Sequence, residues 1–470
     1  MKFRVDEIVK ATGGRLLAGS PESDAGCVCT DTRQMTAGQT FLALRGERFD
    51  GHDFLAQAAA RGVACLVVDR EDRVPAASGG GPAVVLVRDT LAALADLGRA
   101  ARARLACPVL AVTGSCGKTT VKEMLGQVLA QRMTGRTPPA SFNNQIGVPL
   151  TLLGAEPDDE FVLCEFGTNA PGEIATLVSI GRPTIGIVTC VAEVHLAGLG
   201  SIEGVAREKG ALVEGLSPEG VAILNADDPH VARMAQRRLA RGGRVVRVGF
   251  GEAADLKLDD LIQTDRGLHF TVGGEVGFDV PVLGAHQALL AGLAAAAARE
   301  VGVPLEETAE ALRRFQPPPM RLARVELGGN VILLNDCYNA NVLSLAAALD
   351  LLALWPDRRK VFFCGDMLEI GAGSREAHVG LGRRAAEAGV NRLICVGIET
   401  RATAEAAVAA GMKADAVSTF ANSVAAAVAA PAMVDDGDVV LVKGSRGTHM
   451  ERVIDAILGV RKAGGDRPHA

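Results

Sequence analysis

The chain has 470 residues, of which 48% are hydrophobic, 22% are charged and 3% are aromatic, and its net charge is −6. This length predicts two or three domains rather than one core, and the apolar share excludes global disorder. The negative charge and the shortage of aromatic residues argue against nucleic-acid binding. We find neither a long uncharged apolar run nor the apolar stretch of a signal peptide near the start, so we expect a cytoplasmic protein without membrane insertion.

The ten cysteines are predicted to be free thiols. They include one CxC pair and no CxxC pair, and Cys164, Cys190, Cys364 and Cys395 lie inside apolar runs that are typical of strands. Buried free thiols of this kind are common in a reducing compartment. The sequence therefore predicts neither disulfides nor a zinc site.

The elements expected along the chain divide it into three parts. Residues 1–88 form a first unit, in which a short helix precedes a buried strand ending near residue 69. Residues 89–316 alternate strands with amphipathic helices, which predicts a mostly parallel sheet covered on both faces. A hairpin around Gly273–Gly274 and an Ala-rich helix from about His286 follow. Three consecutive prolines then place a boundary near residue 317, and residues 317–470 repeat strand–helix units in a smaller doubly wound sheet.

The strongest chemical motif is AVTGSCGKTT at residues 111–120, where a strand runs through a Gly-rich turn into an amphipathic helix. Backbone N–H groups of such a turn and the N-terminus of the helix bind phosphates. In this motif Lys118 would reach the β- and γ-phosphates, and the Thr119 hydroxyl would bind Mg²⁺. Val112 stands where the common pattern has its first glycine, so TGxxGKT is a shortened variant.

Three possible metal ligands follow strands of this sheet. Thr119 comes after the strand at 107–113, Glu165 closes the strand FVLCE, and His195 lies just past the strand TIGIVTCV. Ligands bind beyond the carboxyl ends of strands in open α/β sheets, so the three side chains suit one or two Mg²⁺ ions that bridge ATP phosphates. A lone Glu165 or His195 would otherwise be an ordinary loop residue.

Lys209 is expected to point inward. In SIEGVAREKGALVEGL the apolar stripe includes position 209, whereas Arg207 and Glu208 are predicted to point outward. An inward lysine needs a buried carboxylate as partner, or it is a reactive lysine of low pKa that CO₂ could carbamylate. The spacing alone leaves both readings open.

Further polar groups mark loops that could bind anions or substrate. Asn143 and Asn144 precede an apolar stretch, where they are substrate ligands or simply turn residues. Arg321 follows the prolines and could clamp a phosphate between domains. The other candidates stand at strand ends in NDCYNAN and VKGSRGTHME, namely Asp336, Tyr338, Asn339, Asn341, Lys443, Ser445 and Arg446.

Together these motifs resemble the Mur ligase family, the ATP-dependent amide-forming ligases of peptidoglycan synthesis. The resemblance covers nearly the whole chain, through TDTRQM, FDGHDF, TGSCGKTTVKEM, FNNQIGVPLTLL, EFGTN, HLAGLGSIEGVAREKG, NDCYNAN, CGDMLEIG and VKGSRGTHMERV. It is greatest to the member that adds D-alanyl-D-alanine to UDP-N-acetylmuramoyl-tripeptide through an acyl phosphate. The diaminopimelate-adding members carry an Asn-Pro-Arg motif, and this sequence has none.

The resemblance implies three α/β domains: a small UDP-muramyl-binding domain (1–88), a central P-loop ATPase domain with a parallel sheet (89–316) and a Rossmann-like C-terminal ligase domain (317–470). It implies a monomer that uses ATP and Mg²⁺ and carries a carbamylated Lys209. The implied catalytic residues are Lys118, His195 and Lys209, and the implied metal ligands are Thr119, Glu165, His195 and Lys209. The implied ATP contacts are Gly114, Ser115, Cys116, Gly117, Lys118, Thr119, Thr120, His286, Arg321, Asp336 and Asn339. The implied substrate contacts are Asp31, Thr32, Arg33, Asn143, Asn144, Lys443, Ser445 and Arg446.

The sequence also departs from the family pattern. DDSYNANP is replaced by NDCYNANV, and GxHNxxNA by GAHQALLAG, so Gln287 and Leu290 stand where the family has asparagines near adenine. With few aromatic residues, adenine and uracil are expected to contact amides, backbone and aliphatic side chains. Two other functions stay open at this point: another amide ligase of the superfamily, of the glutamate-adding or folylpolyglutamate type, and a P-loop protein that uses ATP as a switch.

Overall fold

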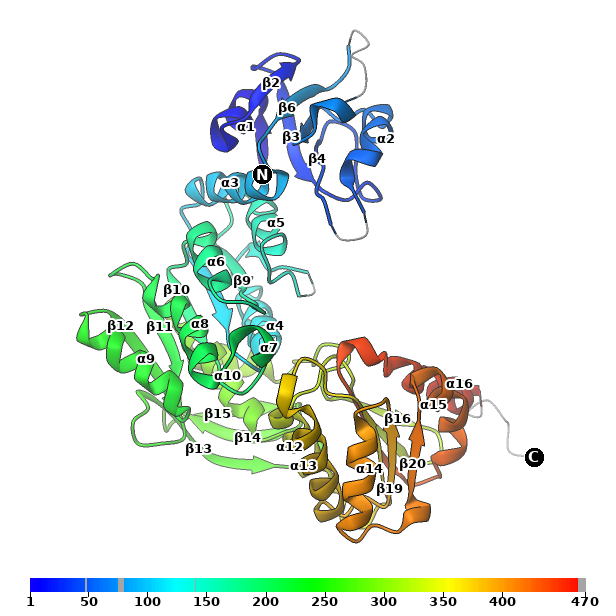
Figure 1. Ribbon diagram of the computed structural model, residues 1–470. Helices are drawn as coiled ribbons and strands as arrows, with labels where there is room; N and C mark the ends of the chain where they lie inside the picture. The colour runs from blue at the N-terminus through cyan, green and yellow to red at the C-terminus, as the bar shows by residue number, and fades with distance from the viewer. Residues whose placement is uncertain (47–48, 75–79, 140, 464–470) are drawn as a thin grey trace.

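The computed structural model describes residues 1–46, 49–74, 80–139 and 141–463, and it folds them into three α/β domains, each built on its own sheet (Figure 1). The domains follow one another along the chain, from blue through green to red in the figure. Within the described residues, every helix is too short or too polar to cross a bilayer. All ten cysteines are free, as predicted.

The first domain is built on a six-stranded sheet with the order β1-β3-β4-β5-β6-β2. Its inner strands are parallel and its edge strands β1 and β2 are antiparallel. The strands are β1 (Lys2–Arg4), β2 (Arg15–Ala18), β3 (Asp24–Cys29), β4 (Thr40–Leu42), β5 (Cys65–Val68) and β6 (Ala83–Leu86), and the helices are α1 (Val5–Thr12) and α2 (Leu55–Ala60).

The central domain holds a nine-stranded sheet with the order β15-β14-β13-β12-β11-β10-β7-β9-β8. All its pairs are parallel except β13–β14 and β14–β15, so the predicted hairpin forms the antiparallel edge. The strands are β7 (Val109–Thr113), β8 (Gly135–Arg136), β9 (Phe161–Glu165), β10 (Ile185–Val188), β11 (Val221–Asn225), β12 (Arg244–Gly249), β13 (Leu256–Gln263), β14 (Leu268–Val272) and β15 (Val276–Val280). The helices are α3 (Thr90–Ala103), α4 (Lys118–Leu129), α5 (Gly147–Leu153), α6 (Glu173–Gly181), α7 (Leu196–Leu199), α8 (Ile202–Glu214), α9 (Pro229–Ala240), α10 (His286–Glu300) and α11 (Leu305–Leu312).

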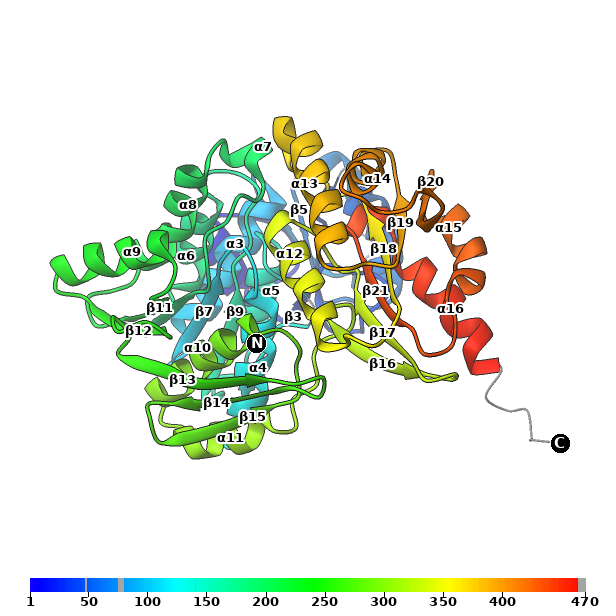
Figure 2. The ribbon, with the colours of Figure 1, turned by 90° about the horizontal axis from the view of Figure 1, so that it is seen from below.

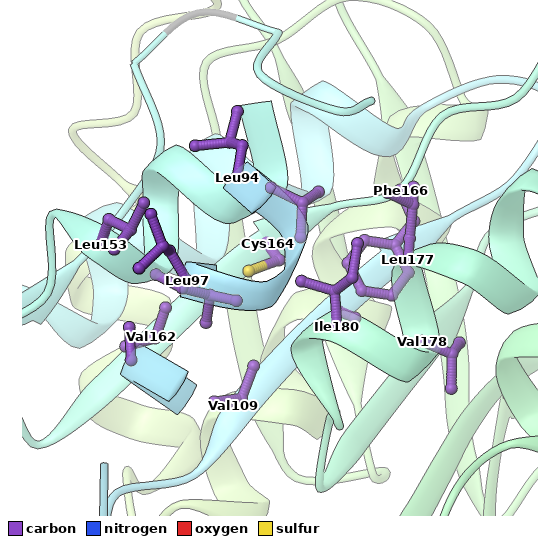
Figure 3. Close-up of a cluster of buried hydrophobic side chains, with 14 of the residues drawn as sticks. Leu94, Leu97, Val109, Leu153, Val162, Cys164, Phe166, Leu177, Val178 and Ile180 are labelled. Carbon is purple, nitrogen blue, oxygen red and sulfur yellow. The ribbon is translucent and has the colours of Figure 1, made fainter. Parts of the chain in front are cut away.

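Apolar cores cover both faces of the central sheet. Strands β7, β9, β10 and β11 are buried along their whole length, as parallel strands between two helical layers must be. One face packs against α4, α10 and α11, with the apolar stripe of α4 turned inward as its spacing predicts. On the other face, Leu94 and Leu97 of α3 meet Cys164 of β9 and Ile180 of α6 (Figure 3). This second core continues into the first domain, which is thereby joined to the central one.

The C-terminal domain is a six-stranded sheet with the order β16-β17-β21-β18-β19-β20, parallel except for the edge strand β16. Its strands are β16 (Ala323–Leu327), β17 (Val331–Asp336), β18 (Lys360–Gly365), β19 (Arg392–Val396), β20 (Val417–Phe420) and β21 (Val439–Lys443). Its helices are α12 (Val342–Asp350), α13 (Ser374–Glu387), α14 (Thr400–Ala409), α15 (Ser423–Ala429) and α16 (Glu451–Ala463). The four predicted strands are present, and β16 and β20 are additions that the sequence analysis missed.

The C-terminal domain turns α12 and α13 toward the central domain (Figures 1 and 2). Its apolar cores on the two faces of the sheet are distinct clusters from those of the central domain, although Leu283, which follows β15, packs into one of them. The two domains therefore meet through loops at the carboxyl ends of their parallel strands, where a polar site can form.

Candidate functional site

A cavity of about 670 Å³ lies between the central and C-terminal domains. It is bounded by the loops that follow β7, β9 and β10 on one side and by those that follow β17, β18 and β21 on the other. The predicted site residues that line it are Ser115, Cys116, Gly117, Lys118, Thr119, Thr120, Asn143, Asn144, Glu165, His195, His286, Arg321, Asp336, Asn339, Lys443, Ser445 and Arg446. The structure thus brings together predicted residues from two domains.

The phosphate loop is shaped by two glycines. Gly114 has φ +147° and Gly117 has φ +81°, and a Cβ at Gly114 would lie 1.9 Å from the Thr189 hydroxyl. Glycine is therefore required for the loop to pass so close to β10. Lys118 Nζ donates to the Gly114 carbonyl at 2.7 Å, so the side chain folds back over the loop. The ammonium group and the N-terminus of α4 therefore lie side by side, where both can bind phosphate groups.

Thr119 and Glu165 contact each other in the cavity wall. The Thr119 hydroxyl donates to Glu165 Oε2 at 2.9 Å, and Asn143 Nδ2 donates to Oε1 at 3.0 Å. Glu165 is only 1% exposed, and within the described residues no ion pair involves it. A buried carboxylate without a cation is costly, and Mg²⁺ prefers oxygen ligands, so this pair fits a magnesium ion. No group of three His, Cys, Asp or Glu suited to a metal occurs in the described parts of the chain.

His195 meets a carboxylate of the C-terminal domain. Its Nδ1 lies 2.7 Å from Oε2 of Glu369, and both residues have positive φ, +53° and +66°. Burial lowers the pKa of His195. Strained backbone at two facing polar residues is typical of a functional site. The sequence analysis missed Glu369, although its place just after β18 could have signalled it.

Lys209 is buried on α8, as predicted. Its side chain is 1% exposed, and within the described residues its Nζ has no hydrogen-bond or ion-pair partner. Burial, followed by the charge of Lys118, lowers the pKa of Lys209 to about 7. The amine lies outside the cavity lining, yet its charge acts on His195. A buried amine that is half neutral at pH 7 fits the reactive reading better than the ion-pair reading.

The prediction that Glu208 points outward is wrong. Glu208 is buried, and its carboxylate accepts from the backbone N–H groups of Gly172 and Ile174, both at 2.7 Å. These N–H groups stand at the start of α6 and have no partner within that helix, so the carboxylate satisfies them. Periodicity placed Glu208 on the outer face of α8, but α6 packs there.

Arg321 crosses from the segment after the prolines to the phosphate loop. Its Nη2 donates to the Thr119 hydroxyl at 2.9 Å, and its guanidinium lies 4.1 Å from the ring centroid of Tyr338. Its neighbours Met320 and Leu322 both have positive φ. The hydroxyl of Tyr338, the only tyrosine of the chain, donates to Ser141 at 2.8 Å, and both residues line the cavity.

Asp336 and Lys443 form a buried ion pair at 2.5 Å. They stand opposite each other at the ends of the paired strands β17 and β21. Lys443 also donates to the Asn339 carbonyl at 3.0 Å, and Asp336 accepts from the Leu322 N–H at 3.1 Å. Burial raises the pKa of Asp336, and Lys443 opposes that shift. The pair fixes both cavity loops of the C-terminal domain.

Replacing Lys443 by methionine is expected to destabilise the C-terminal domain by about 3 kcal/mol, because it leaves the buried Asp336 carboxylate without its cation. The only tryptophan, Trp355, is buried in this domain, so its fluorescence during urea denaturation reports the change directly. Lys413→Met, at an exposed position of the same domain, is the control and should keep the wild-type midpoint. Equal midpoints for Lys443→Met and wild type would contradict the assigned role of the pair.

Some of the remaining predicted residues make hydrogen bonds or ion pairs within their own loops. The side-chain oxygen of Asn144 accepts from the N–H groups of Ile146 and Gly147 at the start of α5, which is the turn role weighed from the sequence. Asp31 and Arg33 lie in the first domain, outside the cavity, and pair at 2.7 Å; the Arg33 guanidinium lowers the pKa of Asp31 to about 2. Their binding roles, like that of Thr32, stay predictions.

Three family models match successive parts of the chain. The model described as the Mur ligase family catalytic domain matches residues 26–102, the Mur ligase middle domain matches 112–298, and the Mur ligase glutamate ligase domain matches 320–446.

Full-length relatives agree with these matches. The chain is 36% identical over 459 residues to the UDP-N-acetylmuramoyl-tripeptide–D-alanyl-D-alanine ligase of Escherichia coli, covering 96% of this chain and 98% of the relative. It is 35% identical to the Bacillus subtilis ligase of the same name, over 92% and 93% of the two chains. A crystal structure of MurF from Acinetobacter baumannii superposes with a TM-score of 0.87, at 30% identity, over 98% of this chain and 99% of that one.

Proposed function

This chain belongs to the Mur ligase family, and from that premise we infer that it joins D-alanyl-D-alanine to UDP-N-acetylmuramoyl-tripeptide at the expense of ATP. The product is a precursor of peptidoglycan. One observation carries the inference: a chain that aligns from end to end with ligases of this name places its phosphate loop and the strand ends of its C-terminal domain around one cavity.

The first chemical step is the activation of a carboxylate. The terminal carboxylate of the tripeptide attacks the γ-phosphorus of ATP, and the bond between this phosphorus and the oxygen that bridges it to the β-phosphate breaks. The products of this step are an acyl phosphate and ADP, which is the leaving group. We propose that Lys118 and the N–H groups at the start of α4 stabilise the charge on the phosphoryl oxygens. Arg321, which already reaches Thr119, supplies a second positive charge from the C-terminal side.

We propose that Thr119 and Glu165 hold one Mg²⁺ and that His195 holds a second, together with a carbamate on Lys209. When bound, magnesium neutralises charge on the phosphates of ATP. The carbamate forms when neutral Nζ attacks CO₂, an N–C bond forms and a proton leaves to solvent. Burial without a partner and a pKa of about 7 both support this reaction at Lys209, because only the neutral amine is nucleophilic.

In the second step, the amine of D-alanyl-D-alanine attacks the acyl carbon, and phosphate leaves from the tetrahedral intermediate. Water would compete with the amine for the acyl phosphate, so the C-terminal domain must close over the cavity before this intermediate forms. Arg321 contacts Thr119, and Glu369 contacts His195. Both contacts join the C-terminal side to the central domain across the cavity, as a closed arrangement requires. Loss of either contact would let water reach the intermediate.

For the nucleotide bases we propose contacts from this chain's own side chains. The Gln287 carbonyl oxygen lies in the cavity wall, buried and without a hydrogen-bond partner among the described residues. It is a suitable acceptor for the amino group of adenine. Leu290 packs against Gly117 instead, so it offers an aliphatic surface beside the phosphate loop. The Asp31–Arg33 loop remains the candidate for the uridine group.

A panel of acceptors distinguishes this function from that of other amide ligases. With ATP and UDP-N-acetylmuramoyl-tripeptide, phosphate release is expected with D-alanyl-D-alanine and to fall by at least about a hundredfold with D-glutamate, L-glutamate or diaminopimelate. Mass spectrometry should show one tripeptide–dipeptide adduct for each phosphate released. Equal rates with glutamate, or phosphate release without an adduct, would refute the proposed function.

A further inference from the structure

Two cysteines line the cavity at the phosphate loop. Cys116 belongs to the loop between β7 and α4, and Cys190 follows the end of the neighbouring parallel strand β10. The Ser115 N–H donates to the Cys190 carbonyl at 2.9 Å, and the Thr189 hydroxyl donates to the Cys116 carbonyl at 2.5 Å. These bonds hold together two cysteines that lie 74 residues apart in the sequence.

Strand pairing and these backbone contacts place the two thiols side by side. The Cys190 thiol also lies 3.7 Å from the Cys116 carbonyl oxygen, and both residues line the cavity. From the C-terminal domain, Asn341 Nδ2 donates to the Cys116 sulfur at 3.2 Å. The Cys116 sulfur therefore accepts a hydrogen bond from the C-terminal domain, as a thiolate would, while the Cys190 thiol donates to the carbonyl of the same residue.

The charges around the pair favour one thiolate beside one thiol. The hydrogen bond from Cys190 lowers the pKa of Cys116, and Asn341 and the ammonium groups of Lys118 and Lys443 lower it further. The same contact with Cys116, together with burial, raises the pKa of Cys190. A thiolate is the nucleophile in thiol chemistry, and a neighbouring thiol can complete a disulfide.

A second pair of cysteines provides an internal comparison. Cys364 and Cys395 stand opposite each other on the paired strands β18 and β19. Both are buried in the apolar core of the C-terminal domain, and burial raises the pKa of both thiols, that of Cys395 to about 12. Both pairs therefore bring two cysteines close together, but only Cys116 and Cys190 line the cavity and lie near cationic side chains.

We propose that Cys116 and Cys190 are an oxidisable dithiol at the nucleotide site, which a hydroperoxide converts to a disulfide. The Cys116 thiolate attacks the hydroperoxide, the O–O bond breaks, and a sulfenic acid and an alcohol, or water from hydrogen peroxide, are formed. The Cys190 thiol then attacks the sulfenic sulfur, an S–S bond forms and water leaves. The two thiols lose two electrons, and the hydroperoxide gains them.

The disulfide is expected to weaken nucleotide binding. It brings the sulfurs to about 2 Å, closer than any hydrogen bond, so the loop at Cys116 must move. The movement displaces the phosphate-binding N–H groups and removes the sulfur from Asn341. Because coupling between equilibria is reciprocal, bound ATP should disfavour the disulfide at equilibrium by the same factor by which the disulfide weakens ATP binding. This consequence rests on the proposed function, which places ATP in the cavity.

The test uses the full-length reduced protein, hydrogen peroxide and two separate readouts. Peptide mass spectrometry without reduction should find a Cys116–Cys190 crosslink, and titration with a fluorescent ATP analogue should show at least about a tenfold loss of affinity that dithiothreitol reverses. Cys190→Ser should form no crosslink, and peroxide should cause no loss of its ATP affinity that dithiothreitol reverses. Cys364→Ala, the matched control, should respond as wild type does, each variant being compared with its own reduced state.

Two outcomes separate the failure of this inference from that of the proposed function. If the reduced protein binds ATP but peroxide yields no Cys116–Cys190 disulfide, or yields one without loss of affinity, the dithiol proposal is wrong and the ligase function stands. If the reduced protein does not bind ATP, the proposed function fails, and the mass-spectrometric readout still decides whether the disulfide forms.

Discussion

Replacing Lys118 by alanine should lower kcat for D-alanyl-D-alanine addition by about a thousandfold. The reason is that Lys118 is the ammonium group placed over the phosphate loop, where its Nζ lies 2.7 Å from the Gly114 carbonyl. The charge that develops on the phosphoryl oxygens would lose one of the cations that stabilise it. Phosphate release in the presence of ATP, tripeptide and D-alanyl-D-alanine measures the change.

A matched control separates this loss from general charge effects. Lys257→Ala removes an ammonium of the same domain from strand β13, where Lys257 pairs at 2.7 Å with the exposed carboxylate of Glu252. That variant should keep wild-type activity, and both variants should melt at nearly the wild-type temperature. Tripeptide-dependent ADP release by Lys118→Ala at a near wild-type rate would refute the assignment of the phosphate loop.

The second large effect is expected at Lys209, where methionine should lower activity by about a hundredfold and yet raise stability. In the unfolded chain the lysine has its ordinary pKa of 10.5, whereas in the folded chain the pKa is about 7. The folded state therefore disfavours the charged amine, at about 1.4 kcal/mol for each pKa unit. Methionine has a similar volume and carries no such penalty.

The pH dependence of this stability difference has a definite sign. Between pH 7 and 10.5 the unfolded chain binds the proton and the folded chain releases it, so wild-type stability rises with pH. The advantage of Lys209→Met should be complete below pH 7 and should vanish above 10.5. Urea denaturation at pH 6 and pH 10 in CO₂-free buffer measures it. A methionine variant that is active, or less stable than wild type at pH 6, would contradict the account.

Carbamylation at Lys209 gives a further test with the same protein. Removing CO₂ and bicarbonate should lower wild-type activity, and adding bicarbonate should restore it. Lys209→Met should be insensitive to both changes. Because only the neutral amine attacks CO₂, the restoration should be faster at pH 8 than at pH 6 when the concentration of dissolved CO₂ is kept equal. Activity that is independent of CO₂ over this range would leave Lys209 with no carbamate role.

Much of the site could be predicted because its residues stand at the ends of strands. Thr119, Glu165 and His195 follow strands of one parallel sheet, and carboxyl ends of parallel strands share an edge, so their meeting in one cavity follows from the sequence. The spacing on α8 also predicted the burial of Lys209. These are local patterns whose geometric consequence does not depend on the rest of the fold.

The features that could not be predicted depend on contacts between elements far apart in the sequence. Glu208 is buried because α6 begins against it, and no spacing within α8 reveals that neighbour. Glu369 reaches His195 only because the C-terminal domain lies over the cavity, and Cys190 meets Cys116 only because β10 pairs with β7. Such contacts are set by domain placement and strand order rather than by periodicity.

The most direct test of the central claim is one mass-spectrometric measurement on one reaction. The tripeptide substrate is labelled with ¹⁸O in its terminal carboxylate and incubated with the protein, ATP and D-alanyl-D-alanine. Activation as an acyl phosphate predicts that each molecule of extended peptide formed is accompanied by one molecule of phosphate that carries ¹⁸O from the carboxylate. Unlabelled phosphate, or phosphate formed without the extended peptide, would contradict the account.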